Sequence, residues 1–204
     1  MSAEPRRKYT LQEYFDLEIS SDARYEYWNG DIFSLSGVSD SHARIEVNLT
    51  AFLSTRLEER SCLVFPANMR LHVPTLPPYR HADLSIVCSQ PIFQEIGGVD
   101  VLTNPALVIE VLSESTEAYD RGDKFTHYKS IGSLREYLLI AQHRPHITQY
   151  VKQGDNSWSY RDVNDLSASL MLPSMECVLS LTDVYQDVQL PAAASLNVQS
   201  PETH

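Results

Sequence analysis

The chain has 204 residues, of which 43% are hydrophobic and 21% are charged, and its formal net charge is −11. This length and composition are typical of one soluble globular domain with a sizeable core, and no apolar run is long enough to span a membrane. The acidic balance argues against broad, non-specific adhesion to nucleic acid, although one face of an acidic protein can still be basic.

We expect one folded domain over residues 9–190, between a disordered N-terminus at 1–8 and a disordered tail at 191–204, because the tail shows no hydrophobic periodicity. The charged start lacks the apolar run of a secretory signal, so we expect a cytoplasmic protein. Three widely spaced cysteines lie in apolar runs and are expected to be buried core thiols: Cys62, Cys88 and Cys177.

The first elements are a short helix and a hairpin. Thr10 and Glu13 have the spacing of a capping box, which predicts a helix starting there. Two β-prone arms flank Asn29-Gly30, a strong signal for a two-residue hairpin turn. Glu26 lies in the first arm between two tyrosines, where a solvent-facing strand residue is the simpler interpretation.

A longer amphipathic helix follows, capped by Ser39 or Ser41. Its apolar stripe consists of Ile45, Leu49, Phe52, Leu53 and Leu57. His42 lies in its first turn and Glu46 one turn further on. A local hydrogen-bonding histidine and an exposed glutamate are the simpler interpretations of these two residues.

The middle of the chain predicts three short strands, over residues 62–66, over 68–74 and around Asp83. Residues 90–105 contain Gly97-Gly98 and end at a proline, so we expect an irregular loop there.

The stretch ALVIEVL, which contains Glu110, is apolar on both faces and is therefore typical of a central strand covered on both sides. Glu110 shares a face with Val108 and Leu112, so its charge must be paired, metal-bound or neutralised. That cost makes Glu110 a candidate for chemistry.

After this strand we expect a helix from Ser115 or Thr116 to Gly132 and then a strand at 136–142, which together form a β-α-β unit with parallel strands. Lys124 shares one side of this helix with apolar residues, so its stem can be buried while its ammonium reaches over the sheet. A hairpin over 146–163, short apolar segments and a terminal helix over Leu181 to Val188 complete the domain.

Carboxylates on two adjacent strands, here Asp83 and Glu110, can bind a hard divalent cation such as Mg²⁺. A nearby lysine can hold or deprotonate the attacking water and offset phosphate charge. These groups are the ones that hydrolysis of a phosphodiester needs.

The chain resembles the PD-(D/E)XK restriction-endonuclease-like superfamily and, within it, the Uma family of restriction endonucleases. The resemblance covers most of residues 9–188 and rests on the stretches RYEYWNGDIFSLSG, SHARIEVNL, HADLSIVC, NPALVIEVLSESTEAYDRGDKFTHY and SLREYLLI. It implies an α/β fold with a restriction-endonuclease-like core, in which helices flank a mixed central β-sheet, with an extra N-terminal hairpin and extra C-terminal strands.

By this resemblance Asp83 and Glu110 are the two acidic residues of the motif, and Glu26 matches a glutamate of the family's first hairpin that would complete a metal site. The metal would be Mg²⁺, with Mn²⁺ as a possible substitute, and the substrate would be DNA. The superfamily has a lysine two residues after the second acid, but this chain has Leu112; the family pattern places that lysine on the next helix, at Lys124. A homodimer is expected, since each site cuts one strand.

Three other interpretations remain open. The carboxylates would be structural if Arg70, Arg80 or Lys124 neutralised them in a buried ion pair, and Lys124 would be structural if it formed a surface pair with Asp120. A catalytically silent module that binds nucleic acid or protein is the second alternative. The third is a zinc hydrolase that uses some of His72, His81, His127, His143 and His146.

Overall fold

The computed structural model describes residues 7–21, 23–35, 37–75 and 77–191. Its centre is a six-stranded sheet with the order β12-β11-β10-β9-β6-β3. The strands are β3 (Leu63–Pro66), β6 (Leu84–Val87), β9 (Leu107–Leu112), β10 (Glu136–Ala141), β11 (Ile147–Lys152) and β12 (Trp158–Val163). This mixed sheet flanked by helices confirms the predicted fold class.

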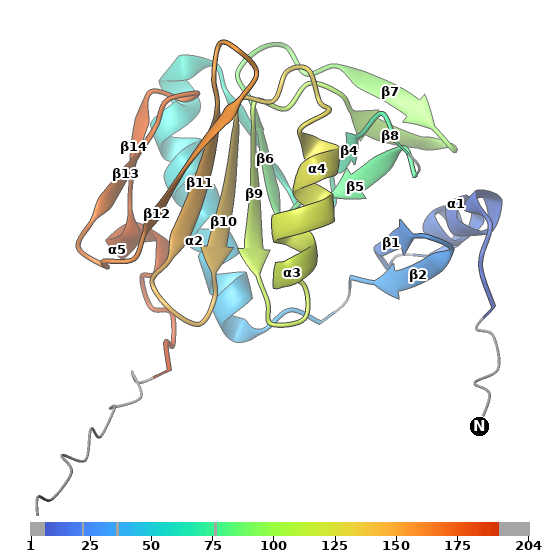
Figure 1. Cartoon of the computed structure of the whole chain (residues 1–204), viewed down its shortest axis with the longest axis horizontal. Coiled ribbons are helices and arrows are strands. Elements are labelled where there is room, and N and C mark those ends of the chain that lie inside the picture. Colours follow the sequence, from blue (N-terminus) through green and yellow to red (C-terminus); the bar gives the residue numbers. More distant parts are fainter. Residues whose placement is uncertain (1–6, 22, 36, 76, 192–204) are drawn as a thin grey trace, which may run out of the picture.

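Helices cover both faces of this sheet (Figure 1). On one face lies α2 (Asp40–Leu57), capped by Ser39 and followed by a 3₁₀ turn at Glu58–Arg60. On the other face lies a continuous helical segment of α3 (Glu117–Tyr119), a π-helical turn (Asp120–Lys124) and α4 (Phe125–Tyr128).

The central strand is β9, in which all six residues are buried. It pairs parallel with β10, which confirms the predicted β-α-β unit, and antiparallel with β6. The β6–β9 register pairs Leu84 with Ile109, so Asp83 and Glu110 occupy the next position on the two strands.

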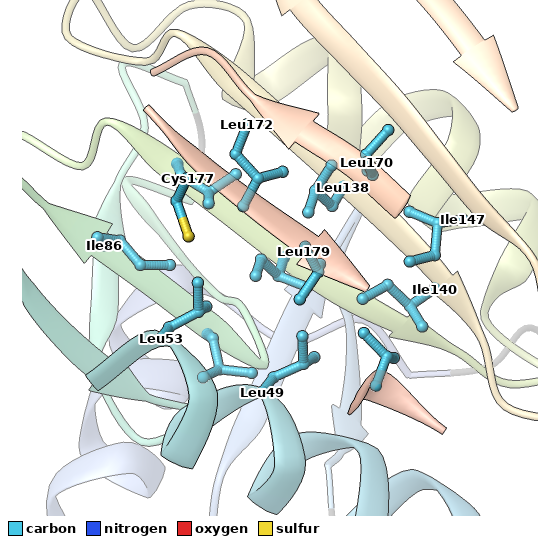
Figure 2. Close-up of a cluster of buried hydrophobic side chains, with 14 of the residues drawn as sticks. Leu49, Leu53, Ile86, Leu138, Ile140, Ile147, Leu170, Leu172, Cys177 and Leu179 are labelled. Atoms are coloured by element: carbon cyan, nitrogen blue, oxygen red, sulfur yellow. The ribbon is translucent and has the colours of Figure 1, made fainter. Parts of the chain in front are cut away.

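Two apolar clusters fill the space between the sheet and the helices. Figure 2 shows the cluster on the α2 side, where Leu49 and Leu53 of α2 pack near Ile86 and Leu179. The predicted stripe of α2 is confirmed except at Phe52, which is only partly buried. The second cluster packs α4 against the opposite face and is lined by Val108, Leu112, Phe125, Tyr128 and Tyr137.

A second sheet has the order β5-β4-β8-β7 and consists of β4 (Arg70–His72), β5 (Tyr79–His81), β7 (Phe93–Ile96) and β8 (Val99–Leu102). The prediction of an irregular loop at 90–105 is therefore wrong, because β7 and β8 form a hairpin. Gly97 has φ 62° and Gly98 has φ 81°, values that a tight turn between strands requires. A Cβ on Gly97 would lie 2.9 Å from the Phe15 ring.

The N-terminal elements form as predicted. Helix α1 (Leu11–Ser20) begins with the capping box of Thr10 and Glu13. Strands β1 (Tyr25–Trp28) and β2 (Asp31–Ser34) pair around Asn29-Gly30, both with positive φ.

The C-terminal part adds the predicted β11–β12 hairpin and a small pair, β13 (Ser169–Leu172) and β14 (Cys177–Ser180). Helix α5 spans Leu181–Val184 and is shorter than predicted.

The prediction that Cys62 and Cys88 are buried thiols is wrong, because these residues form a disulfide that joins the start of β3 to the end of β6. They lie one position beyond the Leu63–Val87 pair of neighbouring strands, so the sheet itself brings them together. Cys177 is a free, buried thiol as predicted.

The expected disordered ends lie almost entirely outside the described residues, and the limits of the domain remain a prediction. Within the described part of the chain, no helix is long and apolar enough to cross a membrane.

Candidate active site

A cavity of about 340 Å³ lies where α2, the β1–β2 hairpin and the helical segment meet the start of β6. The predicted residues Glu26, Asp83, Glu110 and Lys124 all line it. Four elements far apart in the sequence therefore bring their polar side chains to one place.

Asp83 is fixed by the neighbouring strand. Its Oδ2 accepts a hydrogen bond of 2.6 Å from the backbone N–H of Val111, and its Oδ1 lies 3.3 Å from His42 Nε2. Burial alone would raise the pKa of Asp83, but His42 and the charge of Lys124 outweigh it and lower that pKa. Asp83 is thus an ionised carboxylate held in one orientation.

Glu110 is buried inside the central strand, with only 3% of its surface exposed. Its Oε1 accepts a 2.9 Å hydrogen bond from the Tyr128 hydroxyl and lies 3.0 Å from Lys124 Nζ. Burial raises the pKa of Glu110 well above its usual value, although the Lys124 charge opposes this rise.

Lys124 projects from the π-helical turn over the sheet, as predicted. Besides Glu110, its Nζ lies 3.4 Å from Asp120 Oδ1 and 3.9 Å from Glu26 Oε1. The side chain is 7% exposed, so the alternative of a surface pair with Asp120 is wrong: the pair exists, but it is buried. Burial would lower the pKa of Lys124, but the surrounding carboxylates raise it well above its usual value, which keeps the ammonium charged.

Glu26 is 6% exposed, so the interpretation of a solvent-facing strand residue is wrong. Its Oε1 accepts a 3.3 Å hydrogen bond from the backbone N–H of His81. The alternation of side chains along β1 indicated only that Glu26 points to the side opposite its two tyrosine neighbours. The packing of the hairpin decides that this side of the strand faces the cavity.

His42 and Glu46 were not assigned to the site from the sequence alone. His42 Nε2 lies 3.9 Å from Glu46 Oε1 and both side chains turn towards Asp83, with the three ligand atoms within 4.8 Å of one another. Burial and the charge of Asp83 raise the pKa of Glu46, which is only partly exposed. Their i, i+4 spacing was visible in the sequence, but the approach of Asp83 was not.

Four acidic and four basic side chains line the cavity, and two of the basic ones are the histidines His42 and His81. The other two basic residues among the described lining are Lys124 and Arg24, and the Arg24 guanidinium donates a 2.9 Å hydrogen bond to the backbone oxygen of Ala67. The acidic residues of the lining are Glu26, Asp83, Glu110 and Asp120. Carboxylate oxygens are the donors that a hard divalent cation such as Mg²⁺ prefers.

The alternative partners of these carboxylates are engaged elsewhere. Arg70 Nη2 lies 2.8 Å from Glu18 Oε2. Arg80 is fully buried, stacks over Trp28 and lies 3.1 Å from His127 Nδ1. Of Arg70, Arg80 and Lys124, it is therefore Lys124 that pairs with Glu110.

The histidines of the zinc interpretation do not converge. His81 lies against Glu18, His127 against Arg80 and His146 against Asp162. None of the five histidines considered for zinc belongs to a group of three metal-ligating side chains in the described part of the chain. The residues present do not fit a zinc hydrolase of that kind.

Comparisons with known proteins show the fold and the family of this chain. A solved structure from Anabaena variabilis, described as a "putative nuclease belonging to DUF820", aligns with a TM-score of 0.66 at 18% identity, covering 84% of this chain and 96% of that one. The chain belongs to the Uma2 family, described as "Putative restriction endonuclease", whose model matches residues 11–183.

Two proteins of Synechocystis are similar in sequence. The protein sll1609 is 31% identical over 167 residues, covering 82% of this chain and 94% of its own length. The protein slr1290 is 32% identical over 154 residues, with 76% and 80% covered.

Proposed function

We propose that this protein is a metal-dependent endonuclease that hydrolyses DNA phosphodiester bonds. The observation that supports it best is the meeting of Asp83, Glu110 and Lys124 in one cavity of a chain that belongs to a restriction-endonuclease family. Mg²⁺, or Mn²⁺ in its place, would be held by Asp83 and Glu110, with Glu26 completing the acidic group.

Each residue has a distinct task in this proposal. A bound divalent ion would supply an activated water and stabilise charge on the phosphate. Asp83 offers an ionised carboxylate whose orientation is set by the Val111 N–H. Lys124 keeps its proton, so it acts as a charged hydrogen-bond donor to the water or the phosphate rather than as a general base.

Glu110 is the residue whose protonation state a bound cation would change most. Burial favours a retained proton on its carboxyl, and the opposing Lys124 ammonium is shared with Glu26 and Asp120. A second positive charge at the site would favour the ionised ligand form. We therefore propose that cation binding is accompanied by loss of a proton from this cluster.

A catalytically silent binding module is the second candidate. Leu112 stands where the superfamily motif has its lysine, and the net charge of −11 disfavours contact with DNA. The buried ion pair of Glu110 and Lys124 would then serve stability alone.

The test is cleavage of supercoiled plasmid by the full chain with Mg²⁺ or Mn²⁺, beside Asp83→Asn, Glu110→Gln and Lys124→Met. Matched controls at exposed positions are Asp100→Asn, Glu95→Gln and Lys129→Met. We expect nicking or linearisation by the parent and the controls, and a loss of at least about 100-fold in each site variant, because each lacks a group that acts in the transition state.

Circular dichroism would establish that the variants are folded. If Lys124→Met alone remained active, the metal ligands would stand and the role of Lys124 would be wrong. Absence of cleavage by the parent on several DNA substrates, together with no calorimetric Mg²⁺ binding, would favour the silent module.

A further inference from the structure

The Cys62–Cys88 disulfide is accessible from solvent. Cys88 is exposed and Cys62 is half-buried, and both line a cavity of about 890 Å³ between the end of α2, the start of β3 and the loop after β6. Among the described residues that line this cavity, Glu58 is the one that carries a charge. A small reductant without negative charge can therefore reach the two sulfurs without passing through the core.

Strand β3 depends on this bridge for its place in the sheet. It is the edge strand of the six-stranded sheet and, among the described strands, pairs only with β6. None of its four residues is fully buried, and Leu63 is 50% exposed. Because the free energy of apolar burial scales with the area removed from water, the side chains of β3 hold it weakly. The bridge fixes its first end to the end of β6, where Cys88 Sγ lies 3.3 Å from the buried Met175 Sδ.

The other end of β3 lies beside the candidate active site. The register pairs Pro66 with Leu84, the residue that follows Asp83. The next residue, Ala67, accepts the 2.9 Å hydrogen bond from the Arg24 guanidinium, and Arg24 lines the active-site cavity. Ala67, Arg24 and Asp83 also line one further cavity together. A change in the position of β3 therefore reaches both Asp83 and Arg24.

We propose that the Cys62–Cys88 bridge is a thiol–disulfide exchange site for a dithiol and that it controls the active site through β3. One thiolate of the dithiol attacks the sulfur of the more exposed residue, Cys88, the S–S bond breaks, and Cys62 Sγ leaves as a thiolate that takes up a proton. The second thiol of the same molecule then attacks the mixed disulfide at the reductant's own sulfur. A cyclic disulfide leaves and Cys88 becomes a thiol, so two electrons and two protons pass from the dithiol to the protein.

The two redox states differ in how β3 is held. In the oxidised state it is held at both ends, by the bridge and by the hydrogen bond between Ala67 and Arg24. In the reduced state the covalent hold is lost, so β3 opens locally more often and Asp83 loses part of its support. We expect a divalent ion to bind more weakly to the reduced chain. This last expectation alone rests on the proposed function, because the loosening of β3 needs no metal.

The test is amide hydrogen exchange of the full chain, followed by nuclear magnetic resonance at neutral pH before and after treatment with dithiothreitol. In the reduced chain the amides of β3 should exchange at least about tenfold faster, while those of the buried strand β10 stay protected over the same interval. The Val111 amide, which donates its hydrogen bond to Asp83, should also exchange faster, and this measurement reports on the site without any metal. Reoxidation should restore both rates.

Two variants serve as controls. Cys62→Ala/Cys88→Ala should show the fast exchange with and without dithiothreitol, and Cys177→Ala, which keeps the bridge, should respond as the parent does. After removal of the dithiol under nitrogen, calorimetry should find Mn²⁺ bound about tenfold more weakly by the reduced parent than by the oxidised parent, the loss expected when a ligand is held less firmly.

Three results would overturn the inference: a bridge that dithiothreitol leaves intact in the folded protein, β3 and β10 losing protection together, or a Val111 amide whose exchange does not change on reduction. Faster exchange at Val111 in a protein that binds no Mn²⁺ and cuts no DNA would support the switch and leave the nuclease proposal without support. Cleavage by a protein whose β3 and Val111 exchange alike in both redox states would do the reverse.

Discussion

Two buried glutamates, Glu110 and Glu136, have different neighbours, and these neighbours indicate a catalytic role for one and a structural role for the other. Glu110 lies beside a cavity and a lysine, whereas Glu136, which is fully buried on the adjacent strand, is surrounded by hydrogen-bond donors. Its carboxyl accepts hydrogen bonds from the Gln149 side chain and from both the backbone N–H and the hydroxyl of Ser174. Glu136 therefore joins β10 to β11 and to the loop between β13 and β14, and we assign it a structural role.

Glu136 predicts a pH dependence of stability. Burial raises its pKa above 4.5 despite the donors from Ser174 and Gln149. Because the folded pKa exceeds the unfolded value, the stabilisation is fully present below the unfolded pKa and is lost as pH rises through the folded pKa. Relative to Glu136→Gln, the parent should therefore lose free energy of unfolding as the pH rises above the pKa of about 4.3 that a glutamate has in the unfolded chain. Urea unfolding of both proteins as the pH rises measures it, and a constant difference would contradict the assignment.

At the residue scale the sequence predicted the convergence of Asp83, Glu110 and Lys124, because strand adjacency and one helical face determine it. It could not place Glu26 or His42 in the same way. The burial of Glu26 depends on how a hairpin packs against a sheet, and the contact of His42 with Asp83 depends on the position of α2 over β6. Neither follows from local periodicity.

Among the elements, the π-helical turn has the clearest effect on the site. A π-helix inserts extra backbone into a helical turn and is frequent at functional sites. Here it spans Asp120–Lys124, and its first and last residues are both buried. The sequence predicted the helix but not this turn, since no residue type specifies it. The β7–β8 hairpin was missed for another reason: three of the four residues of β7 are exposed, so this strand lacks the alternating pattern of a half-buried strand.

The disulfide predicts a contribution of β3 to stability. Cys62 and Cys88 are 26 residues apart in the sequence, and a bridge of this span destabilises the unfolded chain by about 3.5 kcal/mol of lost entropy. The double variant Cys62→Ala/Cys88→Ala should lose about 2–4 kcal/mol of unfolding free energy under oxidising conditions.

Under reducing conditions the parent should approach the double variant in stability. Cys177→Ala is the matched control, because this cysteine is unbridged and should affect stability equally with and without reductant. Thiol titration of the denatured, unreduced protein should find one free cysteine; three would contradict the bridge.

For the whole molecule, the proposed nuclease activity predicts a two-fold dimer, because one cavity of this kind cuts one strand and duplex cleavage needs two. Sedimentation equilibrium should give a mass of twice 23.1 kDa. Plasmid should then pass from supercoiled to linear with little nicked intermediate. A monomer that only nicks would contradict the dimer while leaving the single site intact.

The path of the chain between its two sheets has a consequence for Asp83. Strand β5 ends at His81 in the four-stranded sheet, and β6 begins at Leu84 in the six-stranded sheet, so only Ala82 and Asp83 connect them. The proposed metal ligand Asp83 therefore lies in the short connection between the two sheets, and its position depends on the angle at which the sheets meet. We therefore expect any substitution that changes how the two sheets pack to alter ion affinity, even at positions outside the cavity.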